Sequence, residues 1–276
     1  MTQAKRAAAF QALHEADGMF VLPNPWDIGS ARILAGLGYK ALATTSAGFA
    51  ASQGLGDYQV TRDLKLAHIR TLAEATDLPL SADLENGFGD APEICAETLR
   101  LAAEAGLVGG SIEDHTGNVD APIYGLAAAA DRVRAAAEAA TGLGFPFMLT
   151  ARAENYLHGR RDLGDTIARL QAYQEAGAHV LYAPGLGTLD EIRSVLGEID
   201  RPLNVLLGPF KGFVPLAELS AMGVKRVSMG SAFSNAATGA LIAAAREVLE
   251  AGTLGFLKGA ASGEAIEALM AKGAPH

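Results

Sequence analysis

Hydrophobic residues along the chain gather into short apolar runs that alternate with longer segments of helical spacing. Eight runs have the length of buried strands, at residues 19–22, 41–45, 79–82, 107–112, 147–150, 179–182, 203–207 and 226–229. Helical patterns follow at about 27–35, 61–74, 91–105, 127–140, 163–176, 188–196, 215–222 and 231–249, and another, 5–16, precedes the first run. Eight strand–helix units predict a parallel sheet closed into an α/β barrel, the (β/α)8 TIM barrel.

The main alternative to a barrel is an open, doubly wound sheet. It is disfavoured because no G-x-G-x-x-G motif follows the first strand. The 276 residues contain no linker-like break, so we expect one domain over 1–276. The barrel would occupy about 18–230, and a long C-terminal helix and tail would occupy 231–276.

Overall charge and cysteine content narrow the class of partner. A net charge of −9 argues against nucleic acid or an anionic membrane, which both need a basic surface. Cys95 is the single cysteine and cannot form an internal disulfide, as expected in a reducing cytoplasm. No apolar stretch has the length of a membrane span, and the first ten residues lack the features of a signal peptide. We therefore expect a cytoplasmic protein without a nucleic-acid or membrane partner.

Two neighbouring strands of the predicted barrel run directly into carboxylates. Asp83 and Glu85 follow the third run, and Glu113 and Asp114 follow the fourth. The helix between them makes a βαβ unit with parallel neighbouring strands, so both acidic pairs lie at the edge where α/β folds bind ligands. Carboxylates gathered in one place repel one another unless a cation or a shared proton lies between them. A divalent metal with oxygen ligands is the simplest solution.

Polar residues also stand at the ends of other predicted strands. They are Thr45, Ser46, Arg152, Glu154, Asn204 and Ser228. Taken singly, each has a structural explanation as a helix cap or a turn residue. Together with the acidic pairs they would point into one mouth, where the planar fork of Arg152 suits a carboxylate ligand. The structural alternative for Arg152 is an ion pair with Glu154 or Glu113.

Two further features are candidates for the chemistry of the site. The corner Thr45-Ser46-Ala47-Gly48 offers hydroxyl and backbone N–H groups that suit an anionic oxygen. His115 follows the acidic pair and could carry a proton, although histidines are also common in surface loops.

Several of these segments resemble motifs of the isocitrate lyase/phosphoenolpyruvate mutase superfamily. Asp83-Leu-Glu85-Asn-Gly-Phe-Gly resembles its D-x-[DE]-[TN]-G-[YF]-G signature, and Ile112-Glu113-Asp114 resembles its I-E-D motif. Residues 151–154 resemble its A-R-[TA]-[DE] motif. Residues 45–48 and 54–57 are similar to its substrate loop and to an upstream metal-shell Asp, and the resemblance runs in order from about residue 18 to 250.

The resemblance implies Mg²⁺, with Mn²⁺ as the alternative ion, and a 2-oxo acid or dicarboxylate as the ligand. The implied metal residues are Asp83, directly or through water, with Asp57, Glu85 and Glu113 orienting the waters. The implied substrate-binding residues are Thr45, Ser46, Ala47, Asp83, Arg152 and Asn204. The helix after strand eight would be exchanged between subunits of a homodimer or homotetramer.

The loop after Asp114 bears on which reaction of the superfamily is expected. Isocitrate and methylisocitrate lyases carry K-K-C-G-H there, whereas residues 115–125 contain neither Cys nor Lys. Phosphonomutases usually keep a Lys where His115 stands, and a Glu of the methylisocitrate-type lyases is replaced around Ala183-Pro184. These departures argue against authentic isocitrate or methylisocitrate cleavage and against phosphonomutase chemistry.

Metal-assisted enolate chemistry remains the leading hypothesis. We expect a Mg²⁺-dependent carbon–carbon lyase or decarboxylase that acts on a small 2-oxo or hydroxy dicarboxylate through an enolate(pyruvate)-like intermediate. The candidate catalytic residues are Arg152, His115 and Glu113, with Tyr124 as an alternative proton carrier.

Three alternatives stay open. The first is P–C bond chemistry, as in phosphoenolpyruvate phosphonomutase or phosphonopyruvate hydrolase. The second is a 2-oxo acid binding protein with little catalysis. The third is an aldolase with a Schiff-base lysine; it is disfavoured because the predicted strands end without Lys, and Lys211 lies in the loop after strand seven.

Overall fold

The computed structural model describes residues 1–208 and 214–276, so Lys211 lies outside the described residues. The strands are β1 (Phe20–Leu22), β2 (Leu42–Ala43), β3 (Leu80–Asp83), β4 (Gly109–Glu113), β5 (Met148–Arg152), β6 (Val180–Tyr182), β7 (Leu203–Leu206) and β8 (Arg226–Ser228). All neighbouring pairs are parallel, in the order β1-β8-β7-β6-β5-β4-β3-β2. At the remaining seam the Ala43 N–H donates to the Pro23 carbonyl at 3.0 Å. The predicted (β/α)8 barrel is confirmed as a nearly closed one.

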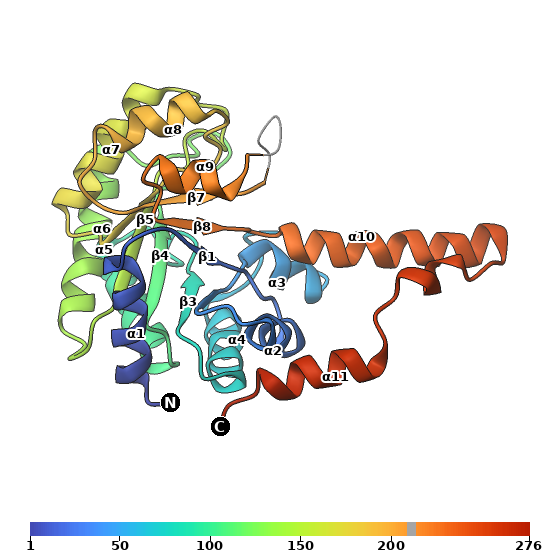
Figure 1. Ribbon diagram of the computed structural model, residues 1–276. Coiled ribbons are helices and arrows are strands. Elements are labelled where there is room, and N and C mark those ends of the chain that lie inside the picture. The colour runs from blue at the N-terminus through green and yellow to red at the C-terminus, as the bar shows by residue number, and fades with distance from the viewer. Residues whose placement is uncertain (209–213) are drawn as a thin grey trace.

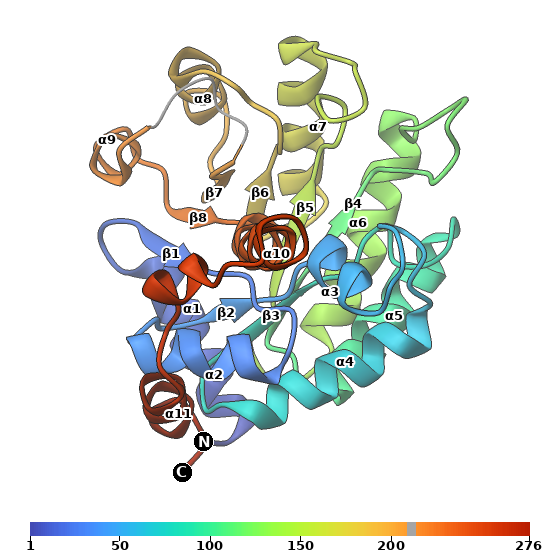
Figure 2. The ribbon, with the colours of Figure 1, turned by 90° about the vertical axis from the view of Figure 1, so that its right-hand side faces the viewer.

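Helices surround the strands, as Figure 2 shows from the end at which α10 emerges. They are α1 (Gln3–Glu15), α2 (Ile28–Leu37), α3 (Ser46–Ser52), α4 (Arg62–Ala75), α5 (Pro92–Glu104), α6 (Leu126–Thr141), α7 (Leu163–Glu175), α8 (Leu189–Leu196), α9 (Leu216–Ala221), α10 (Ala232–Arg246) and α11 (Gly263–Lys272). No helix in the described ranges combines the length and apolar character needed to cross a membrane.

Residues 46–52, for which no helix was predicted, form the short helix α3. The Thr45 hydroxyl caps it by accepting a hydrogen bond from the Gly48 N–H at 3.2 Å. Phe49 holds it against the barrel by stacking on His68 of α4, with ring centroids 3.6 Å apart. The predicted anion-binding corner is therefore the first turn of a helix, where backbone N–H groups have no partner within the helix.

The amino-terminal end of the barrel is closed by α1. Phe10 and Ala7 of this helix are fully buried and pack with apolar residues at the start of several strands. Gly109 makes room for Phe10, because a Cβ there would lie 2.7 Å from the phenyl ring. The opposite end, which carries the carboxyl ends of the strands, holds the cavity described below.

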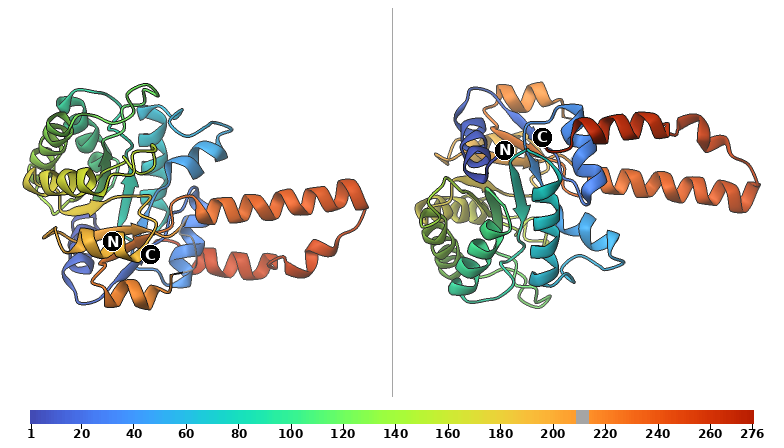
Figure 3. Two further views of the ribbon diagram at one scale, coloured as in Figure 1. Left: turned by 90° about the horizontal axis from the view of Figure 1, so that it is seen from above. Right: turned by 90° about the horizontal axis from the view of Figure 1, so that it is seen from below.

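After β8 the chain leaves the barrel as a long arm (Figures 1 and 3). The helix α10 continues into the π-helical turn Glu247–Ala251, and α11 then returns to pack on α2. Large apolar side chains are exposed along it, with Leu241 67% and Leu249 85% accessible. Gly36 of α2 allows the return contact, since a Cβ there would lie 2.2 Å from the Leu269 carbonyl oxygen.

Candidate active site

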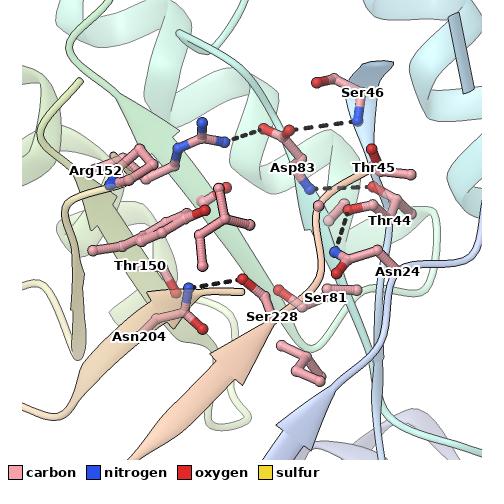
Figure 4. A pocket seen from close by; sticks show the side chains of 18 of the residues that line it. Asn24, Thr44, Thr45, Ser46, Ser81, Asp83, Thr150, Arg152, Asn204 and Ser228 are labelled. Carbon is pink, nitrogen blue, oxygen red and sulfur yellow. Dashed lines mark hydrogen bonds and ion pairs between the residues drawn. The ribbon is translucent and has the colours of Figure 1, made fainter. Parts of the chain in front are cut away.

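A cavity of about 200 Å³ opens at the carboxyl ends of the strands (Figure 4). The predicted site residues that line it are Thr45, Ser46, Ala47, Asp57, Asp83, Arg152 and Asn204. The remaining predicted residues, Glu85, Glu113 and His115, do not line the cavity; each is buried beside it. The structure thus brings the candidates together, in two layers.

Arg152 lies at the centre of the acidic residues. Its Nη1 is 2.9 Å from Oδ1 of Asp83, its Nη2 is 3.1 Å from Oε2 of Glu113, and its Nε donates to Oε1 of Glu154 at 2.7 Å. The expected convergence of carboxylates on a guanidinium is present, and so are both ion pairs considered as the structural alternative. Two of the five N–H groups of Arg152 are not used in these contacts and remain for a ligand.

Asp83 ends β3 and stays ionised. Burial alone would raise its pKa, but Arg152, Lys65 and hydrogen bonds lower the pKa to about 2. Its Oδ1 accepts the Glu85 N–H at 3.2 Å, and its Oδ2 faces the Ser46 N–H at 3.4 Å. Glu85 adopts φ +51° to make this turn, a left-handed conformation that is uncommon for a non-glycine residue.

The neighbouring carboxyl groups hold their protons more tightly than usual. Burial and then the charge of Asp83 raise the pKa of Asp57, and the same two causes raise that of Glu85 to about 7. Burial also raises the pKa of Glu113 well above its ordinary value, against the opposing effect of Arg152. The cluster therefore carries more carboxyl groups than its positive charge can neutralise.

Lys65 of α4 stands behind this cluster and was not predicted as a site residue. It is completely buried, and its Nζ has no hydrogen-bond partner among the described residues, as is also true of Oε1 of Glu85. Burial lowers the pKa of Lys65, and the charges of Asp83, Glu85 and Asp57 oppose that shift. The available signal was the position of Lys65 on the buried stripe of α4 with Ile69 and Leu72.

These residues fit a hydrated divalent cation. Five acidic side chains, Asp57, Asp83, Glu85, Glu113 and Glu154, stand against two basic ones, Arg152 and Lys65. Within residues 1–208 and 214–276, no three His, Cys, Asp or Glu side chains form a ready-made metal cage. Mg²⁺ does not need one, because it keeps several waters and is often held by one or two carboxylates. Asp83 fits a direct ligand, and Asp57 and Glu85 fit ligands that act through water.

A small aromatic cluster covers Glu113. The Tyr58 hydroxyl donates to Oε1 of Glu113 at 2.8 Å, and Nδ1 of His115 lies 3.8 Å from the same oxygen. The His115 ring stacks on His158, with centroids 4.0 Å apart. Burial, followed by His158 and Arg152, lowers the pKa of His115 to about 4, so its imidazole is neutral at pH 7. Tyr58 and His158 were not predicted as site residues.

Asp114 was expected to point into the mouth, and this prediction is wrong. Its Oδ2 accepts hydrogen bonds from Nη1 of Arg169 at 3.0 Å and from the Tyr173 hydroxyl at 2.6 Å, and its Oδ1 accepts the Glu154 N–H at 2.7 Å. Successive residues of a strand point to opposite faces, so Glu113 inside places Asp114 outside. Asp114 fastens β4 to α7 rather than serving a ligand.

Two other candidates are also engaged by protein groups. Tyr124 donates its hydroxyl to Asp90, and Arg132 lies over its ring, so it does not line the cavity. Asn204 donates to the Ser228 hydroxyl at 2.9 Å and accepts from Nε of Arg226 at 2.8 Å. Asn204 therefore joins β7 to β8 at the cavity wall.

Comparison with known proteins agrees with this architecture. A family model described as phosphoenolpyruvate phosphomutase matches residues 10–249. The 2-methylisocitrate lyase of Escherichia coli K12 is 31% identical over 200 residues, which are 70% of this chain and 66% of that protein. The 2,3-dimethylmalate lyase of Eubacterium barkeri is 26% identical over 247 residues, 86% of this chain and 83% of that protein.

Solved structures extend the similarity over nearly the whole chain. A crystal structure of a protein from Burkholderia cenocepacia J2315 is 57% identical with a TM-score of 0.94, and the match covers 96% of this chain and 95% of that one. The structure of 2,3-dimethylmalate lyase is 25% identical with a TM-score of 0.85, covering 98% and 95%. By sequence and by fold, this chain belongs to the phosphoenolpyruvate phosphomutase family, within the isocitrate lyase/phosphoenolpyruvate mutase superfamily.

Proposed function

We propose that the protein is a Mg²⁺-dependent lyase that cleaves a carbon–carbon bond of a small 2-oxo or hydroxy dicarboxylate in the cytoplasm. The observation that carries this proposal is the excess of carboxyl groups around Asp83, opposite the guanidinium of Arg152, in a cavity of metabolite size. Two relatives described above support it because they are lyases, 2-methylisocitrate lyase and 2,3-dimethylmalate lyase. A structural neighbour, phosphonopyruvate hydrolase, was crystallised with oxalate and Mg²⁺.

The reacting end of the ligand would be held at the mouth. The start of α3 suits the carboxylate next to the oxo carbon, through the Ala47 N–H and through the Ser46 N–H, which now makes a long contact of 3.4 Å with Asp83. The two N–H groups of Arg152 that its carboxylate contacts leave unused suit the same carboxylate. This grip fixes the bond to be broken relative to the protein, an effect of orientation. Asp83 would hold the Mg²⁺, which would supply Lewis acidity for the negative charge that develops on the 2-oxo oxygen.

At pH 7 the site holds a neutral imidazole, that of His115, beside carboxyl groups whose pKa is raised. The His115 imidazole is neutral, and its lowered pKa makes it a weak base; among the described residues its Nδ1 has no hydrogen-bond partner, and the Tyr58 hydroxyl donates to the neighbouring Glu113. Glu113 would act by holding Arg152, and His115, which lies beside Glu113, would exchange a proton with that carboxyl group.

A panel of 2-oxo and hydroxy dicarboxylates assayed with and without Mg²⁺ tests the proposal. We expect one of them to release pyruvate or glyoxylate only when Mg²⁺ is present. Asp83→Asn should abolish both turnover and Mg²⁺-dependent ligand binding, whereas Asp114→Asn, a matched carboxyl change outside the cavity, should leave ligand affinity unchanged. Turnover of phosphonopyruvate alone would establish P–C chemistry instead. Tight binding of pyruvate, oxalate or 2-oxoglutarate by calorimetry without turnover of any acid would establish a binding protein.

We also propose that the arm of α10 and α11 mediates a homodimer or homotetramer through exchange of α10 between subunits. Its exposed leucines support this, because large apolar side chains left uncovered by the part of the chain that the structure describes are typical of subunit contacts.

A further inference from the structure

A second polar layer lies inside the barrel, beneath the residues at its mouth. The residues two positions before Asp83, Glu113 and Arg152 are hydroxyl residues, and all of them line the cavity. They are Ser81, Ser111 and Thr150. Side chains two positions apart in a strand share a face, so these hydroxyl groups point into the barrel below the acidic layer. The interior of a (β/α)8 barrel is ordinarily filled by branched apolar residues, so this chamber departs from the usual packing.

Arg226 of β8 lines the same cavity and is 4% exposed. Its Nε donates to Asn204 at 2.8 Å, its Nη2 donates to the Thr150 hydroxyl at 3.0 Å, and its Nη1 lies 3.2 Å from Nε2 of His14. No acidic side chain forms an ion pair with Arg226 in the described ranges, and residues 209–213 contain neither Asp nor Glu. Every partner of this buried guanidinium is neutral.

A buried charge without a counter-charge is costly unless something compensates it. Burial lowers the pKa of Arg226 to about 10, opposed by Tyr182, so the guanidinium is still charged at pH 7. Three of its five N–H groups are used, which leaves two for the cavity. Arg152 differs in this respect, since three carboxylates surround it. The mouth is therefore acidic and the inner chamber is basic.

We propose that the inner chamber is a second anion subsite, in which Arg226 and the hydroxyl groups of Ser81 and Ser111 bind the carboxylate of a dicarboxylate that is remote from its reacting end. The proposal rests on the proposed function for the class of ligand and adds where its second charge goes. A ligand held at α3 and Arg152 would extend along the barrel axis, so that its two carboxylates meet the two arginines. Specificity for dicarboxylates over pyruvate then comes from β8.

Calorimetry with matched ligands tests this subsite. The titrations use pyruvate, oxalate, oxaloacetate and 2-oxoglutarate with Mg²⁺, on the wild-type protein and on Arg226→Met and Arg226→Lys. Loss of a charged hydrogen-bonding group should weaken the two longer dicarboxylates on the order of 10- to 100-fold in Arg226→Met. Pyruvate and oxalate, which are too short to reach both layers, should change by less than about threefold, a difference below one charged contact. Arg226→Lys should restore part of the lost affinity.

A second pair of variants guards against misfolding, because Arg226 also bonds three residues of the barrel. Ser81→Ala and Ser111→Ala remove only hydroxyl groups, and the double variant should show the same selective loss to a smaller extent. A crystal structure with the tightest dicarboxylate should place a carboxylate within hydrogen-bond distance of Arg226. Equal losses for pyruvate and dicarboxylates, or chloride or phosphate on Arg226 with the ligand wholly above it, would overturn the subsite alone. A wild-type protein that binds none of these acids would overturn the subsite and the proposed function together.

Discussion

The hydroxyl of Tyr58 donates a 2.8 Å hydrogen bond to Oε1 of Glu113, which joins the loop after α3 to the end of β4. Tyr58 follows Asp57 directly and has a φ of +61°, so this bond holds the loop in a conformation that the backbone alone disfavours. Tyr58→Phe should lower kcat/KM on the order of tenfold, the effect of losing one hydrogen bond, with the melting temperature nearly unchanged. Steady-state kinetics and thermal melts measure the two effects. A large drop in melting temperature with intact kinetics would show that the bond is only structural.

Arg152 should be essential for both stability and binding. Arg152→Met leaves the carboxyl groups of Asp83, Glu113 and Glu154 without their shared cation, so we expect a loss of about 3 kcal/mol in the free energy of unfolding. Arg152→Lys keeps the charge but not the planar fork, and it should retain most of the stability while losing ligand affinity. Urea denaturation and calorimetry separate the two effects. Full affinity in the Lys variant would contradict a forked contact with the ligand.

The stability of the metal-free protein should fall as the pH rises from about 4.5 to 7. Burial and Asp83 raise the pKa of Glu85 from 4.5 to about 7, so in this window the folded protein holds a proton that the unfolded chain has lost. The stability contributed by Glu85 is fully present below the pKa that Glu85 has in the unfolded chain. It is lost as the pH rises through the pKa that Glu85 has in the folded protein, and the total loss is on the order of 3 kcal/mol. The free energy of unfolding, measured by urea denaturation in EDTA at several pH values, should fall less steeply with pH in Glu85→Gln than in the wild-type protein. The same pH dependence of stability in the two proteins would show that the pKa of Glu85 is not raised by folding.

Lys65 should set how strongly the fold depends on the metal. Lys65→Met removes the buried cation near Asp83, Glu85 and Asp57 and leaves their charge less neutralised. We expect a lower melting temperature in EDTA than for the wild-type protein, and a larger upward shift when Mg²⁺ is added. Thermal melts over a Mg²⁺ series measure both quantities, with Lys5→Met on the outer helix α1 as the matched control. The same Mg²⁺ shift in Lys65→Met and in the wild-type protein would be evidence against this role.

Charges placed on the arm should break the assembly. Leu241→Glu and Leu249→Glu each put a carboxylate where a subunit interface is proposed, whereas Leu216→Glu puts one on α9, away from the arm, at a side chain that is 41% exposed. Light scattering coupled to size-exclusion chromatography should give a smaller species for the arm variants and an unchanged one for the control. A monomeric wild-type protein at micromolar concentration would refute the arm contact.

Much of the barrel could be predicted because the apolar runs are short and end at polar residues. The predicted strand ends at Asp83, Glu113 and Arg152 agree with the structure to within one or two residues. The helix α3 could not be predicted from periodicity, since it is short and owes its position to Thr45 and to the contact of Phe49 with His68. Such tertiary contacts override weak local preferences.

The direction of side chains was harder to predict than the position of strands. Asp114 was predicted to share the mouth with Glu113 because both follow the fourth strand, although strand alternation points the two side chains to opposite faces. Lys65 and Arg226 were not predicted as site residues, since Lys65 lies within a helix and Arg226 at the start of a strand, and neither stands at the carboxyl end of a strand. Only the closed barrel brings Lys65 close to the acidic side chains and places Arg226 in the inner chamber, where it faces no carboxylate among the described residues.

The helix α10 begins next to Ser231 in the cavity wall, and its Ser234 lies against Gly48 of α3, where an added Cβ would meet the serine oxygen at 3.1 Å. The same helix also carries Leu241, which is exposed on the arm outside the barrel (Figure 1). A second subunit bound to the outer end of α10 would therefore restrain the entrance of the ligand cavity. By thermodynamic reciprocity, ligand binding in the cavity would in turn raise the affinity between subunits, so that ligand occupancy and assembly would increase together.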